Sequence, residues 1–135
     1  MQEDKSVDDI AKLTTLLHTG GRHQGRQLLS AAKLAEALYK TEARGLPSGM
    51  SSPYGEGRYH LSFWAVPHRT RGGCWFQIPY MQGLGGNSIV LQPNGITAFR
   101  FADGHTYDVD NMVLAAEAIR PFSCPAGPGN APPRR

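Results

Sequence analysis

The residues with the clearest chemical potential are Ser30 and Lys33, which enclose two alanines in the sequence Ser-Ala-Ala-Lys. A lysine three residues after a serine at a helix start can accept the hydroxyl proton, which makes the serine a nucleophile toward a carbonyl carbon. The same serine also stands directly before an apolar helical pattern, where its ordinary role is to cap the first turn. Motifs of two fixed residues occur often by chance, so we interpret Ser30 as an N-cap and Lys33 as a solvated residue.

The histidines and cysteines do not form a metal-binding pattern. The five histidines lack a partner four residues on along a helix, and the two cysteines lack the spacing of a zinc site. We therefore expect no metal and no cofactor. Cys74 and Cys124 either form a disulfide, if the protein is exported, or remain thiols, and the sequence alone leaves both possibilities open.

The N-terminal segment predicts a helix from about Ser6 to His18. Ser6 is a suitable N-cap, and Asp9 completes a capping-box-like pair three residues later. Apolar residues then recur at helical spacing until a pair of glycines ends the pattern. We expect the glycine-rich turn that follows to return Leu28 and Leu29 to the core.

Two further segments also have the period of an amphipathic helix. The last one follows Asp108 as its cap and ends at Pro121. The other follows Ser30 and has the most regular apolar spacing in the chain. Its apolar positions are Ala31, Leu34, Ala35, Leu38 and Tyr39.

The middle of the chain predicts extended structure after a loop. Residues 43–57 are rich in glycine, proline and serine and show no period, which predicts the loop. Residues 58–67 alternate with large apolar groups on both sides, which predicts one strand covered on both faces. A second strand is expected at 74–78, where Pro79 either ends it or places it at a sheet edge.

The predicted strands continue into an antiparallel hairpin. Strands at 87–92 and 96–102 flank the turn-forming sequence Pro-Asn-Gly at 93–95. The predicted fold is α+β, with a sheet of three to four antiparallel strands, two N-terminal helices and a C-terminal helix packed on the sheet. We expect one domain over residues 1–122 and a disordered tail rich in proline and glycine over 123–135.

The composition of the chain argues against two classes of partner, nucleic acid and a membrane. The formal charge is +3, but the basic residues are scattered, which argues against nucleic acid. No apolar run approaches the roughly 20 residues of a membrane span, so we expect no membrane partner. The first ten residues lack the pattern of a signal peptide, which leaves the compartment open, because an export signal can lie on a parent sequence.

Three segments carry a resemblance over roughly residues 6–120. They are SVDDIAKLTTLLHTGGRHQGRQLLSAAKLAEAL, SPYGEGRYHLSFW and GLGGNSIVLQPNGITAFRFADG. Their order and spacing resemble the β-lactamase-related serine hydrolases, which include class C β-lactamases, esterases and 6-aminohexanoate-oligomer hydrolases. The first segment resembles two helices of that family's helical lobe, and the other two resemble its late sheet strands beside the catalytic cleft. The last predicted helix matches the family's closing helix.

This resemblance implies the C-terminal part of a serine β-lactamase/transpeptidase-like fold. Members of the family use a Ser-x-x-Lys helix and a tyrosine motif to cleave an amide or ester. On the alignment implied by the resemblance, both motifs would precede Met1. The chain is therefore expected to be inactive alone, with a small amide or ester as the substrate of its parent.

The resemblance also implies that one wall of the cleft remains. The family's third motif, usually with a lysine or histidine, aligns with a stretch that has neither, although Tyr80 lies in it and could line a cleft or pack as an amphipathic edge residue. By position, the Leu84 N–H is the candidate oxyanion donor. Asn87 either orients substrate or ends the turn. Three glycines would allow close approach to a ligand or serve a tight bend, namely Gly83, Gly85 and Gly86.

Two other hypotheses remain beside the inactive fragment. The chain could be a non-catalytic binding module, which would use an exposed sheet edge and the pocket near Gly83 to Asn87. In that case its partner is the missing N-terminal catalytic segment or a second copy, because an uncovered apolar surface favours association. Alternatively the chain is an enzyme built on Ser30 and Lys33, which requires both side chains to face a cleft next to the glycine-rich strand.

Overall fold

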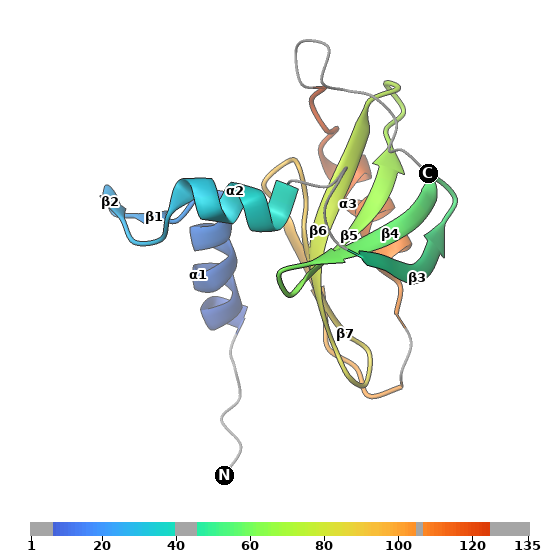
Figure 1. Cartoon of the computed structure of the whole chain (residues 1–135), viewed down its shortest axis with the longest axis horizontal. Coiled ribbons are helices and arrows are strands. Elements are labelled where there is room, and N and C mark those ends of the chain that lie inside the picture. Colours follow the sequence, from blue (N-terminus) through green and yellow to red (C-terminus); the bar gives the residue numbers. More distant parts are fainter. Residues whose placement is uncertain (1–6, 40–45, 105–106, 125–135) are drawn as a thin grey trace.

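The computed structural model describes residues 7–39, 46–104 and 107–124 (Figure 1). The predicted cap at Ser6 and the part of the predicted tail beyond Cys124 lie outside the described residues. All three predicted helices are present. They are α1 (Val7–His18), α2 (Ala31–Tyr39) and α3 (Val109–Ile119).

The link between α1 and α2 is a small hairpin of two short strands, β1 (Arg22–His23) and β2 (Arg26–Gln27). The carbonyl of Gly21 accepts hydrogen bonds from both Leu28 N and Leu29 N, at 2.8 and 3.2 Å. A Cβ on Gly21 would come within 2.6 Å of the Leu29 carbonyl oxygen, so this closure requires glycine. The two leucines are 51% and 42% exposed, so the prediction that they return to the core is wrong. Backbone bonds, rather than their burial, close the link.

The main sheet has six antiparallel strands, paired in the order in which they occur along the chain. The class of the sheet is therefore as predicted, but the prediction of three to four strands is too low. The strands are β3 (Leu46–Ser52), β4 (Gly55–His60), β5 (Phe63–Arg69), β6 (Trp75–Gly83), β7 (Asn87–Leu91) and β8 (Thr97–Arg100).

The two additional strands come from segments that the sequence predicted differently. The expected loop at 43–57 contains β3 and the first part of β4. The expected single strand at 58–67 is broken by a tight turn at Leu61 and Ser62, whose φ angles are 48° and 71°. A two-residue hairpin turn with both φ angles positive matches the twist of its flanking strands. Because glycine and asparagine usually supply this geometry, leucine and serine gave no turn signal.

Pro79 neither ends β6 nor marks a sheet edge, because β6 is an interior strand. Pro79 lies opposite Ala65 of β5, whereas the register between β6 and β7 begins at Tyr80. The absent N–H of the proline therefore falls where pairing on that side has stopped, which is where a strand tolerates proline.

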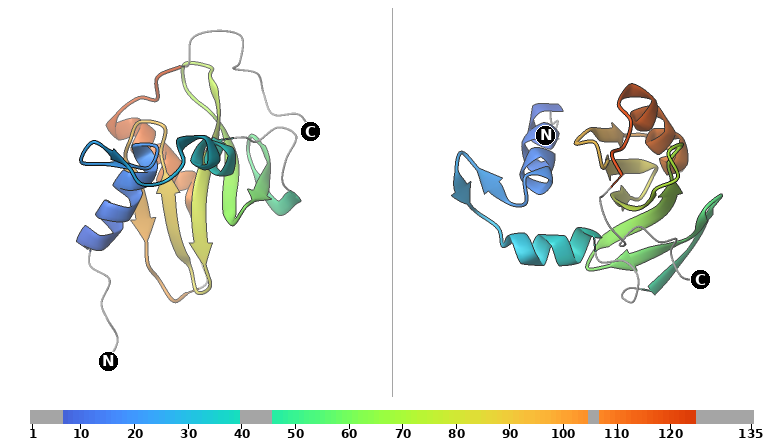
Figure 2. Two further views of the ribbon diagram at one scale, coloured as in Figure 1. Left: turned by 60° about the vertical axis from the view of Figure 1, so that its left-hand side comes forward. Right: turned by 90° about the horizontal axis from the view of Figure 1, so that it is seen from above.

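The sheet has different helical cover on its two faces (Figures 1 and 2). Val90 and Leu91 are neighbours on β7 and so point to opposite faces. Val90 belongs to the core cluster that includes Val113 of α3. Leu91 instead packs in a second cluster with Leu17 of α1 and Leu38 of α2. The closing helix thus covers one face, as predicted, and the first two helices contact the other.

A disulfide joins Cys74 to Cys124, with the Cα atoms 5.6 Å apart. This resolves the alternative that the sequence left open. Cys74 lies in the turn between β5 and β6, and Cys124 follows α3, so the bond holds the segment after α3 to the sheet. Phe122, within this segment, is buried in the core cluster.

The double substitution of Cys74 and Cys124 by serine should lower the free energy of unfolding by about 4 kcal/mol, because the disulfide closes a long loop in the unfolded chain. Urea unfolding of the oxidised protein, with and without dithiothreitol, measures this effect. Reductant should leave the double variant unchanged. An oxidised wild-type chain whose midpoint does not respond to reductant would contradict the expectation.

Candidate functional site

The predicted residues Gly83 to Asn87 form the turn between β6 and β7. Gly83 lies opposite Asn87 in the register of these strands. Gly85 and Gly86 have φ angles of 98° and 109°, in the region that side chains other than glycine rarely adopt. The backbone of this tight turn is sufficient to account for both glycines.

Hydrogen bonds fix this turn to the chain that follows β8. Asn87 donates from Nδ2 to the Leu84 carbonyl at 3.3 Å, and its Oδ1 accepts from Ala102 N at 3.2 Å. The Tyr107 hydroxyl donates to the Gly83 carbonyl at 3.0 Å. Asn87 therefore closes the turn with both ends of its amide. Leu84 at the tip is 88% exposed.

Ser30 and Lys33 lie apart from this turn. Lys33 N donates to Ser30 Oγ at 3.3 Å, which is the hydrogen bond of a helix N-cap, and both side chains are exposed. Figure 1 shows the start of α2 directed away from the sheet, whereas the β6–β7 turn lies at the far end of the sheet. The structure thus does not bring the Ser-x-x-Lys pair to the glycine-rich turn.

Tyr80 lines a cavity of about 150 Å³ on the face of the sheet that α3 covers. Because β6 is an interior strand, Tyr80 is not an edge residue, and only 2% of it is exposed. The strands contribute Gly57 and Val66 to the cavity, and the start of α3 contributes Asp110. The other lining residues are Ser52, Tyr107 and Val109.

The polar groups that line the cavity differ in the hydrogen bonds that they already form within the protein. Ser52 Oγ accepts from Tyr54 N at 3.1 Å and lies within donating distance of the Gly55 and Pro67 carbonyls. The Tyr107 hydroxyl is bonded to Gly83. The carboxylate of Asp110 is the one formal charge among the residues that line the cavity.

Burial dominates the electrostatics of Tyr80 and Asp110. Burial and, second, the negative charge of Asp110 raise the pKa of Tyr80 to about 12. Burial also raises the pKa of Asp110, and Asp108 adds to this, while His68 acts in the opposite direction. Tyr80 therefore stays protonated at neutral pH and contributes an aromatic ring rather than a base.

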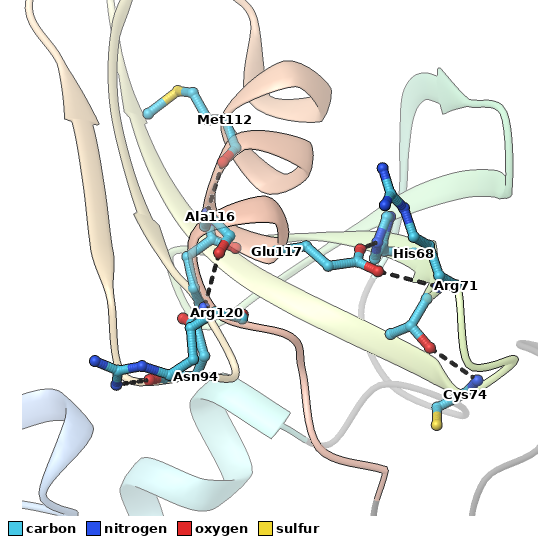
Figure 3. Close-up of polar contacts among 10 residues, drawn as sticks. His68, Arg71, Cys74, Asn94, Met112, Ala116, Glu117 and Arg120 are labelled. Carbon is cyan, nitrogen blue, oxygen red and sulfur yellow. Dashed lines mark hydrogen bonds and ion pairs between the residues drawn. The ribbon is translucent and has the colours of Figure 1, made fainter.

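A second polar cluster joins His68 to Glu117 (Figure 3). His68 Nε2 lies 2.5 Å from Glu117 Oε2, and Arg71 N donates to Glu117 Oε1 at 3.0 Å. The rings of Tyr54 and Phe122 meet the His68 ring edge-on, at centroid distances of 5.2 and 5.9 Å. The pair connects the last turn of α3 to β5 and the turn that follows it.

The sequence does not indicate this cluster, because 49 residues separate His68 from Glu117. Two features of the sequence are consistent with a contact between these residues. His68 shares its strand face with Val66, and Glu117 lies four residues after Val113 on the buried side of α3. A histidine–carboxylate pair forms part of a catalytic triad. Within the described part of the chain, however, His68 has no hydrogen bond to a hydroxyl or thiol nucleophile.

The balance of forces on Glu117 predicts an acid-sensitive contribution to stability. Burial alone would raise the pKa of Glu117, but hydrogen bonds from Arg71 N and His68 more than offset it and hold the pKa below the ordinary value of 4.5. The ionised carboxylate therefore stabilises the fold above that pH, and this contribution is lost as the pH falls through the lower folded-state pKa.

Glu117→Gln should lower the free energy of unfolding by about 1–3 kcal/mol at pH 7, because it weakens two hydrogen bonds to a charged group, one of them part-buried. The difference from wild type should shrink as the pH falls below 4.5, the ordinary value for this carboxyl. Urea unfolding curves, recorded at about one per pH unit between pH 3 and pH 7, measure this difference in the free energy of unfolding. Asp103→Asn, at an exposed position, is the matched control. A constant difference over this range would contradict the assignment.

Within residues 7–39, 46–104 and 107–124, no three histidine, cysteine or acidic side chains are placed to hold a metal ion. In the same ranges, no helix combines the length and the apolar character that crossing a bilayer demands. Comparison with protein-family models, curated proteins and solved structures finds no match to this chain.

Proposed function

We propose that this chain is the C-terminal part of a β-lactamase-related serine hydrolase, whose parent cleaves a small amide or ester, and that the chain is inactive alone. Three features support the proposal. Two helices precede an antiparallel sheet, a closing helix follows it, and that helix packs on the sheet. The two N-terminal helices lie within the first segment that carries the resemblance, and the closing helix lies where the family has its own closing helix.

The proposed inactivity rests on one observation, the hydrogen bond from Lys33 N to Ser30 Oγ. A serine nucleophile needs its hydroxyl directed at a substrate and close to its base. Ser30 instead caps an exposed helix start, on a helix that contacts the sheet through its other end (Figure 1). The formal Ser-x-x-Lys motif is therefore accounted for by local structure.

The contribution of this chain to the parent would be one wall of a cleft. The β6–β7 turn offers backbone N–H groups at an exposed tip, braced by Asn87 and Tyr107. Leu84 at that tip has few neighbours to exclude water, and oxyanion stabilisation is strong only in a water-excluded site. In this proposal the segment that bears the nucleophile would enclose the tip.

The purified chain should not hydrolyse nitrocefin or p-nitrophenyl acetate above the buffer rate, and neither should Ser30→Ala. That variant should still lose about 1 kcal/mol of stability, because it removes the N-cap. Ser30→Asp is the matched control, since aspartate keeps the cap but has no hydroxyl nucleophile. Turnover that both substitutions abolish would overturn the proposed inactivity.

The family assignment has its own test in the reading frame upstream of Met1. We expect that frame to encode a Ser-x-x-Lys helix and a tyrosine motif, and the longer chain to hydrolyse an amide or ester. In that chain Leu84→Pro, which removes the N–H, should lower kcat/KM about 10²–10³-fold. Leu84→Ala retains the N–H and should have little effect. An upstream frame without these motifs would refute the assignment.

A second candidate function, a non-catalytic interaction module, is favoured by a groove of about 710 Å³ between α1 and the β1–β2 hairpin. Leu13 and Leu28 line it, and each is 51% exposed. Contiguous exposed apolar surface of this kind often marks a protein interface. Analytical ultracentrifugation separates the two candidates. Concentration-dependent association that Leu28→Ser weakens favours the module, and a cooperative monomer argues against it.

A further inference from the structure

A row of apolar side chains crosses the α3 face of the sheet and extends beyond the helix that covers it. Tyr59, Trp64 and Tyr80 lie directly opposite one another on β4, β5 and β6. Their ring centroids are separated by 4.6 and 6.4 Å. The row continues to Val90 under α3 and to Leu46 at the sheet edge. Exposure rises along it from 0% at Val90 and 2% at Tyr80 to 38% at Tyr59 and 72% at Leu46.

The cavity of about 150 Å³ lies beside this row, where Tyr80 passes under the start of α3. Its volume is below the roughly 300 Å³ at which pockets begin to hold whole drug-sized ligands. It therefore suits a single head group of a ligand, with the remainder of the ligand lying outside. The exposed ring of Tyr59 and the half-buried ring of Trp64 provide the adjoining surface.

The charge at the cavity selects the sign of that head group. Asp110 is the only formally charged residue that lines it, and within the described part of the chain it forms no ion pair. Burial disfavours its carboxylate and Asp108 adds further negative charge, while His68 and the N-terminus of α3 act against them. A cation at this position would offset both penalties.

The aromatic residues that line the cavity also favour a positively charged head group. The faces of aromatic rings carry negative potential and attract ammonium and guanidinium groups. Tyr80 and Tyr107 both line the cavity beside Asp110. An aromatic wall that contains one carboxylate is thus complementary to an organic cation rather than to a phosphate or carboxylate ligand.

We infer that this cavity binds the guanidinium or ammonium group of a ligand, with Asp110 as counter-ion, Tyr80 and Tyr107 as aromatic walls, and the Tyr59–Trp64 surface as the platform for the rest of the ligand. The site does not rest on the proposed hydrolase function. The same head group can belong to a free small molecule or to a basic side chain of a peptide, and the experiment distinguishes these two sources.

The test is an NMR titration of the full chain with methylguanidinium, using methylurea as the uncharged ligand of the same shape. The chain has two tryptophans, so two indole N–H signals are present, and Trp75→Phe identifies the signal of Trp64. We expect methylguanidinium to shift the Trp64 signal with saturation in the millimolar range, and methylurea to leave it unchanged. Equal shifts from the two ligands, or a shift without saturation, would overturn the site.

Two variants localise the binding. Asp110→Asn should weaken methylguanidinium about tenfold, since a hydrogen bond to a charged partner is lost. Asp8→Asn makes the same change in net charge on α1 and should not alter binding. Because Asp110 is an exposed residue, its substitution should leave the circular dichroism spectrum unchanged. Full affinity in a folded Asp110→Asn variant would refute the site.

The source of the head group is decided by a peptide, Ala-Pro-Pro-Arg-Arg, added to the same samples. Proline and arginine both pack well on tyrosine and tryptophan rings. Binding at least tenfold tighter than methylguanidinium, and weakened by Tyr59→Ala, identifies a basic peptide as the ligand class. Equal affinity for both probes, with no effect of Tyr59→Ala, identifies a free small cation.

Discussion

The packing of α3 on the sheet is the constraint on which the rest of the structure depends, and polar contacts fix the helix at its C-terminal end. The Ala116 carbonyl, in the last turn of α3, accepts from Arg120 N at 3.1 Å. Here Asn94, in the β7–β8 turn, donates from Nδ2 to the carbonyls of Ala116 and Arg120 at 3.0 and 2.8 Å (Figure 3). Glu117 binds the opposite side, at His68 and Arg71. The register of α3 over Val90 and Ile78 is thereby set from two different turns of the sheet.

Local pattern was sufficient to predict the parts of the fold that local interactions decide. The three helices follow from apolar spacing, and the β7–β8 hairpin follows from the Pro-Asn-Gly turn, in which Gly95 has a φ of 81°. The turn at Leu61 and Ser62 was missed because neither residue favours positive φ by itself. Pairing of β4 with β5 on both sides of the turn, from Arg58–Ala65 to His60–Phe63, imposes that conformation. Long-range pairing thus overrode the local preference, and it also converted an expected loop into β3.

The residues of the candidate site also divide into those that the sequence indicates and those that only the folded structure brings together. Tyr80 and the glycine-rich turn were expected at the site because the resemblance aligns them with the family's third motif and its cleft wall. Asp110 and Tyr107 were not recognised, since a carboxylate at a helix start has an ordinary role there. Their meeting with Tyr80 and Gly57 depends on where α3 crosses the sheet, which the spacing of apolar residues does not specify. His68 and Glu117 depend on the same crossing.

Tyr107 links the two regions for which functions are proposed. Its hydroxyl holds the Gly83 carbonyl in the β6–β7 turn, while its side chain lines the cavity beside Asp110. A substitution at Tyr107 would therefore disturb the turn and the cavity together, and its effect could not be assigned to either one. Asp110 contributes only to the cavity, and the Leu84 N–H contributes only to the turn. These two positions separate the functions because the hydrogen-bond network connects the two regions through Tyr107, and neither Asp110 nor Leu84 N–H takes part in that connection.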